Sequence, residues 1–90
     1  MSNKSEIAWT RKLEGDKVEV CARRFGDRWS FFSRGGRGER WQPITRPGLE
    51  DWLELLDGVR RRIGRQRDRP EEESRLVALI REQFPDANVV

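Results

Sequence analysis

The sequence contains no histidine and a single cysteine, Cys21. These absences exclude an intramolecular disulfide, a zinc knuckle and an imidazole general base, which removes most classes of enzyme. No apolar stretch approaches the roughly 20 residues that span a membrane, and the N-terminus lacks the hydrophobic core of a signal peptide. We therefore expect a cytoplasmic protein that is not an enzyme and needs no metal or other cofactor.

The sequence also lacks a convincing catalytic constellation. Cys21 has no histidine to activate its thiol, and an unassisted thiol on a strand is usually passive. The carboxylates of Glu50, Asp51, Glu54 and Asp57 lie close together, but their positions match the solvent face and the dipole of a helix rather than a general acid and base.

Lysine is scarce, with three residues against sixteen arginines. A guanidinium suits bidentate phosphate contacts and stacking better than an ammonium does, although a GC-rich genome would give the same bias. The formal net charge is only +3, yet residues 1–47 hold eleven basic against six acidic residues, while residues 48–90 hold eight against ten. We therefore expect the basic surface in the first half of the chain.

A chain of 90 residues is predicted to form a single domain over 1–90, with a flexible tail at 1–5. A domain of this size buries a modest share of its surface, so a homodimer is expected. Charged residues make up 39% and apolar residues 34% of the chain, which is typical of a folded domain with a heavily solvated surface.

Alternating apolar and polar residues predict an antiparallel sheet over 7–44. Its strands are expected at 7–13, 17–25, 28–34 and 39–43, the last ending at Pro43 because proline has no N–H for the ladder. If Trp29 and Phe31 continue the buried face of Val18 and Val20, Phe32 lies on the open face between arginines. Packing alone explains that position poorly, so Phe32 is a candidate for stacking on a base.

From residue 49 onward the apolar period becomes helical, and two helices are predicted, at 49–63 and 70–84, joined by a basic connector at 64–69. Gly48 is the expected N-cap of the first, and Asp68 with Glu71 resembles a capping box for the second. The fold class is thus α+β, with four antiparallel strands followed by two helices. The apolar positions expected to share the core and a dimer interface are Trp52, Leu53, Leu56, Val59, Ile63, Leu76, Val77, Leu79, Ile80 and Phe84.

The segment 23–46 holds seven arginines, two tryptophans and three phenylalanines around four glycines. Aromatic faces stack on unpaired bases and guanidinium groups pair with phosphates, so this composition favours a platform for single-stranded nucleic acid. The alternative is that Trp29 and Phe31 are simply core. Two further basic segments, the glycine loop 34–38 and the run 60–69, either contact phosphates or are merely solvated.

Trp41-Gln42-Pro43, followed by PGLEDWLELL at 47–56, resembles the family of positive cofactor four, a single-stranded-DNA-binding transcriptional coactivator, which includes small uncharacterised bacterial proteins. Residues 7–63 follow the element order of that family. The resemblance implies a twisted four-stranded sheet, dimerised through helices, whose open face binds single-stranded DNA in transcription regulation. The chain departs from the family in a shortened turn at 44–48 and in its second helix.

The sequence thus predicts a homodimer that binds single-stranded nucleic acid, with DNA favoured by the resemblance, on one face of its sheet. The resemblance matches Trp41 to a tryptophan that approaches bases. The alternatives are a protein-interaction module on the same surface, and a structural homodimer in which Trp41 is buried without a ligand. The residues expected to bind nucleic acid are Arg23, Arg28, Phe32, Arg34, Arg37, Arg40 and Trp41.

Overall fold

The computed structural model describes residues 6–13, 15–26, 28–36, 38–65 and 69–89. They belong to two compact units, one ending at Pro47 and the other beginning at Gly48. The expected single domain over 1–90 stays a prediction, and the expected tail at 1–5 lies outside the described residues.

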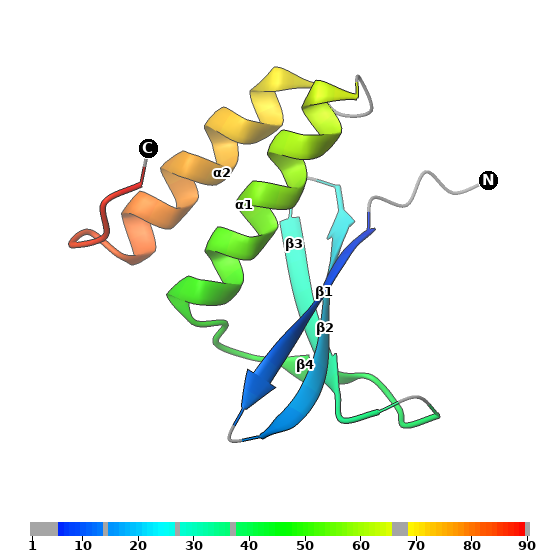
Figure 1. Ribbon diagram of the computed structural model, residues 1–90. Coiled ribbons are helices and arrows are strands. Elements are labelled where there is room, and N and C mark those ends of the chain that lie inside the picture. The colour runs from blue at the N-terminus through cyan, green and yellow to red at the C-terminus, as the bar shows by residue number, and fades with distance from the viewer. Residues whose placement is uncertain (1–5, 14, 27, 37, 66–68, 90) are drawn as a thin grey trace. The chain divides into compact units, whose positions relative to one another are not determined.

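The predicted α+β fold class is confirmed, with four antiparallel strands followed by two helices (Figure 1). The strands pair in the order β1-β2-β3-β4, so each lies beside its neighbour in the chain. The elements are β1 (Glu6–Leu13), β2 (Asp16–Phe25), β3 (Arg28–Arg34), β4 (Gln42–Ile44), α1 (Leu49–Gly64) and α2 (Pro70–Gln83).

The fourth strand differs from its prediction. It begins at Gln42 rather than at residue 39, and Pro43 lies inside it, opposite Phe32. β4 is the edge strand of the sheet, so no further strand pairs with its outer side. A proline is tolerated there because no ladder hydrogen bond is needed on that side. Trp41 consequently lies just before the strand and not within it.

One face of the sheet is apolar and largely buried. Ile7, Ala22 and Phe31 lie in one row across β1, β2 and β3, and Trp9 lies opposite Val20 in the next row of that face. All except the half-buried Trp9 are buried, and the Trp9 and Phe31 rings meet edge to face at 6.1 Å between centroids. Phe31 is therefore a core residue on the face of Val20, which is the condition under which Phe32 lies on the open face.

The second unit is a pair of helices that lie side by side in Figure 1. Gly48 is the N-cap of α1, as predicted, and its carbonyl accepts hydrogen bonds from the N–H groups of Asp51 and Trp52. Arg69 is the N-cap of α2 and makes no side-chain capping bond. Asp68, the expected capping residue, lies outside the described residues.

In α1, one apolar position lies outside the core of the single chain and one acidic position differs from its prediction. Leu53 is 39% exposed, whereas Leu55 is fully buried, because the buried stripe runs through Trp52, Leu55 and Val59 at steps of three and four residues. Asp51 is buried rather than solvated, since it lies four residues before Leu55 on that same stripe.

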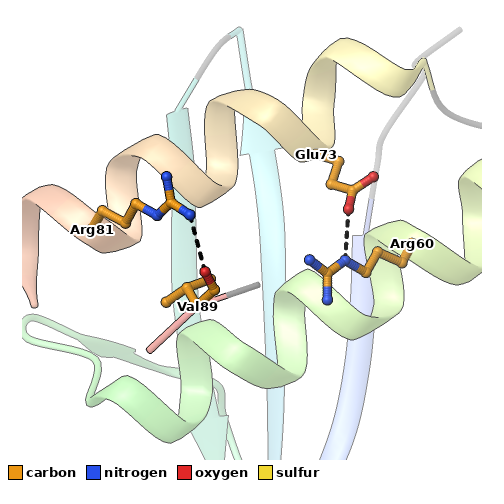
Figure 2. Close-up of polar contacts among 4 residues, drawn as sticks. All are labelled: Arg60, Glu73, Arg81 and Val89. Atoms are coloured by element: carbon orange, nitrogen blue, oxygen red, sulfur yellow. Dashed lines mark hydrogen bonds and ion pairs between the residues drawn. The ribbon is translucent and has the colours of Figure 1, made fainter. Parts of the chain in front are cut away.

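Polar contacts join the two helices and the segment that follows them (Figure 2). The Arg60 Nε of α1 donates to Glu73 Oε2 of α2 at 2.7 Å, and Arg81 Nη2 donates to the carbonyl oxygen of Val89 at 3.1 Å. None of the described helices is long and apolar enough to cross a membrane.

Candidate nucleic-acid interface

The strand register brings most of the predicted binding residues to one face of the sheet. Arg23 lies opposite Ser30, Phe32 opposite Cys21, and Arg34 opposite Glu19, so all alternate with the buried residues of β2 and β3. We call this side of the sheet the basic face. Its strand residues are Glu6, Ala8, Thr10, Lys12, Lys17, Glu19, Cys21, Arg23, Phe25, Arg28, Ser30, Phe32, Arg34 and Pro43.

Two arginines of the basic face lie over aromatic rings. The guanidinium carbon of Arg23 is 5.2 Å from the centroid of the Phe32 ring, and that of Arg34 is 4.4 Å from the centroid of Trp41. Both rings are half-buried. Arg34 thus links Trp41, which precedes β4, to the strand residues of this face.

Carboxylates hold the same two arginines in place. Arg23 Nε donates to Glu6 Oε2 at 3.1 Å, and Arg34 Nε donates to Glu19 Oε1 at 2.8 Å. The Arg23–Glu6 pair is exposed and the Arg34–Glu19 pair part-buried. Pairs that solvent reaches contribute little to stability, but these orient each guanidinium across its ring. The strand residues of the basic face carry five basic and two acidic side chains, so the face remains positive.

Cys21 is the buried member of the basic face. Burial raises the pKa of its thiol above the ordinary value of 9.0, the nearby Arg23 cation opposes that rise, and the Glu6 carboxylate adds to it. The hydrogen bond to Glu6 in turn raises the pKa of Arg23. At neutral pH the Cys21 side chain is therefore a neutral thiol beneath a charged pair.

The remaining predicted residues lie apart from the two arginine-aromatic contacts. Arg28 is exposed at the start of β3, where it lies opposite Phe25, a phenylalanine that is 58% exposed. Arg40 is exposed in the segment between β3 and β4. Arg37 lies outside the described residues.

The structure adds a hollow that the sequence did not indicate. It has a volume of about 720 Å³ and lies on the basic face, at the end of β1, the start of β2 and the start of the loop after β3. The alternation of residues along β2 is enough to put Lys17 and Glu19 on the face of Arg23. The position of Lys12 beside them depends on the pairing register of β1 with β2, which the structure provides. The lining residues are Thr10, Lys12, Lys17, Glu19, Gly35 and Gly36.

Among the residues that the structure describes, no group of three or more histidine, cysteine, aspartate or glutamate side chains could hold a metal ion. No protein-family model, no curated protein and no solved structure matches the chain. The resemblance to the positive-cofactor-four family rests on the residues quoted for it alone.

Proposed function

We propose that the protein binds single-stranded nucleic acid on the basic face and is not an enzyme. The observation that carries this proposal is the pair of arginine-aromatic contacts, Arg23 over Phe32 and Arg34 over Trp41, on one face of one sheet. A guanidinium over a ring forms a planar surface on which a base can stack, and both groups are sequence-tolerant partners. Unpaired bases stack there, whereas a duplex keeps its bases covered.

Phosphates in this proposal are bound by the exposed arginines, Arg28 and Arg40. Arg23 and Arg34 act mainly as stacking groups, because each already donates its Nε–H to a carboxylate. The preferred ligand is DNA, and the setting is transcription regulation, as the resemblance implies. Arg37 remains an expected contact by sequence position alone.

We also propose that the binding species is a homodimer formed through the helices. Leu53 supports this part, because it is a large apolar side chain on α1 that is 39% exposed in the single chain. A dimer would place two basic faces in one particle, and the stoichiometry of binding would then be one long strand per two chains.

The experiment is a fluorescence anisotropy titration of a labelled single-stranded 20-mer, at several salt concentrations, with the matching duplex as the competing ligand. We expect the single strand to bind more tightly than the duplex and its affinity to fall with added salt, because phosphate contacts release counterions. The end point of the titration gives the stoichiometry.

Arg34→Gln is the informative variant and Arg24→Gln its matched control. Arg24 also lies over a tryptophan, Trp29, at 6.0 Å, but on the buried face of the sheet. We expect Arg34→Gln to weaken binding and Arg24→Gln to leave it unchanged. Equal losses in both variants, or no binding by the natural chain at low salt, would reject the proposal.

A second candidate function is a protein-interaction module on the same surface. The ion pairs of Arg23 and Arg34 with glutamates favour it, as does the exposed ring of Phe25, because aromatic and arginine side chains dominate the energetics of protein interfaces. Such a module would ignore oligonucleotides in the same titration.

A further inference from the structure

We propose that the hollow at the end of β1 and the start of β2 is a phosphate subsite that binds the sugar-phosphate backbone of a single-stranded nucleic acid. This inference rests on the proposed function and adds a second kind of contact to it. The two lysines that line the hollow, Lys12 and Lys17, were not among the predicted binding residues.

The first observation is a pair of like charges in direct register. Lys12 lies opposite Lys17 across β1 and β2, on the same face. Like charges directly opposite each other destabilise a sheet, so packing offers no reason for this pair. Within the described part of the chain, neither lysine side chain has a hydrogen bond or an ion pair beyond the backbone ladder. An anion between the two ammonium groups would relieve their repulsion.

The second observation is the remainder of the lining. Thr10 contributes a hydroxyl group, and Gly35 and Gly36 contribute backbone without side chains. A Cβ built on Gly36 would meet no atom within 4 Å, so a ligand can approach the backbone there. Hydroxyl groups, ammonium groups and accessible N–H groups are the donors that proteins use for phosphate oxygens.

The third observation is the charge balance. Glu19 is the acidic lining residue, and its carboxylate accepts the 2.8 Å hydrogen bond from Arg34. A second carboxylate, that of Glu39, lies beside the hollow, because its Oε1 is 3.0 Å from the place that a Cβ on Gly35 would take. Two ammonium groups therefore face two carboxylates, of which Glu19 already has a cationic partner. Two of the three lysines in the chain line this hollow.

The hollow is continuous with the arginine-aromatic contacts. Thr10, Glu19 and Arg34 form one row across β1, β2 and β3, and Lys12 and Lys17 form the next row on the same face. Rows two residues apart are separated by about 7 Å along a strand. A strand whose base stacks at Trp41 and Arg34 can therefore place a neighbouring phosphate between the lysines.

The test compares two single-stranded 20-mers, oligo(dT) and an abasic strand with the same number of phosphates. The variant is Lys12→Gln/Lys17→Gln. If each lysine contacts one phosphate, the negative slope of log affinity against log salt becomes less steep by about 1.4 in the variant. The affinity at 0.1 M salt then falls by about 25-fold. Because phosphate contacts do not depend on the bases, the variant should bind both strands more weakly by the same factor.

Two further variants keep this test decisive. Arg75→Gln/Arg81→Gln removes the same charge from α2, and we expect it to leave the salt slope unchanged. Lys12→Arg/Lys17→Arg retains the charge and should retain binding. The melting temperature of the glutamine variant should equal or exceed that of the natural chain, because a repulsive pair has been removed.

The outcomes separate this inference from the proposed function. A natural chain that binds neither strand rejects both. A Lys12→Gln/Lys17→Gln variant that binds oligo(dT) with the natural slope, or that loses no more than the Arg75→Gln/Arg81→Gln control, rejects the phosphate subsite and leaves the stacking surface standing.

Discussion

Replacing Trp41 by alanine should weaken binding of a single strand by about 1–3 kcal/mol, the usual contribution of one stacked base. At 1.4 kcal/mol for each factor of ten, the dissociation constant rises between about 5-fold and about 140-fold. Arg34 lies 4.4 Å from the centroid of this ring, so a base must stack on the opposite face of the indole or displace the guanidinium. Displacement would cost about 0.5–1 kcal/mol and place the result near the lower limit.

Anisotropy of a labelled oligo(dT) 20-mer measures this change, and thermal unfolding of the same samples measures stability. Loss of the Arg34–Trp41 contact should remove about 0.5–1 kcal/mol, which lowers the Tm of a chain of this size by about 2–8 °C. The titration is therefore run well below the Tm of the variant. Trp41→Phe is the control, because it keeps an aromatic face. A folded Trp41→Ala variant with the natural affinity would remove Trp41 from the binding surface.

Two predictions concern the fold. Leu55→Ala should lower the free energy of unfolding by about 2–5 kcal/mol, as for other leucines truncated in a core. Leu53→Ala should change it by less than about 1 kcal/mol, because Leu53 is exposed. Urea titrations measure both values, and comparable losses in the two variants would contradict this difference in burial. The Cys21 thiol should react with iodoacetamide more slowly than a free cysteine, at a rate that still rises above pH 9, because burial raises its pKa. Reaction at the rate of a free thiol would contradict this burial. Since the unfolded chain then loses its thiol proton first, the free energy of unfolding that this thiol contributes should decrease as pH rises through the ordinary pKa of 9.0.

The sheet could be predicted from the sequence because each hairpin carries its own local signals. Strict alternation along β2 separates Val20 from Cys21, and Gly15 and Gly26 supply positive φ angles of 90° and 66° beside the strand ends. The fourth strand was less predictable, because its pairing is set by an edge position that accepts Pro43 rather than by its own pattern.

The helix boundaries were also predictable, and Trp52, Leu56 and Val59 of α1 are buried as expected, but the limits of the buried stripe were not predictable. Leucine occupies positions 49, 53, 55 and 56, so several stripes compete when apolar residues are simply counted. The observed stripe includes Asp51, a residue that composition places in solvent. A carboxylate can be buried only where partners in the folded structure satisfy it, and the spacing of apolar residues along the chain does not reveal those partners.

The candidate site was predictable in part. The interpretation of Phe32 as a residue of the open face required only alternation along β3, and the register confirms that position. The contact between Arg34 and Trp41, and the juxtaposition of Lys12 with Lys17, depend on how strands align. A shift of one residue in either pairing would move these side chains to opposite faces, so no local pattern could have indicated them.

The basic face therefore carries two kinds of positive charge, arginines paired with glutamates and lysines without such partners. The two kinds should contribute differently to the salt dependence of binding. Arg23 and Arg34 are each held by a glutamate and a ring, so a phosphate that recruits them must either use the remaining guanidinium N–H groups or displace a carboxylate. Exposed pairs of this kind contribute at most about 1 kcal/mol, less than a well-stacked base supplies, so displacement is feasible but gains little. Lys12 and Lys17, by contrast, repel each other until an anion arrives. The counterion release that makes affinity fall with salt should thus come mainly from the lysine hollow and the exposed arginines, while the paired arginines determine where the bases stack.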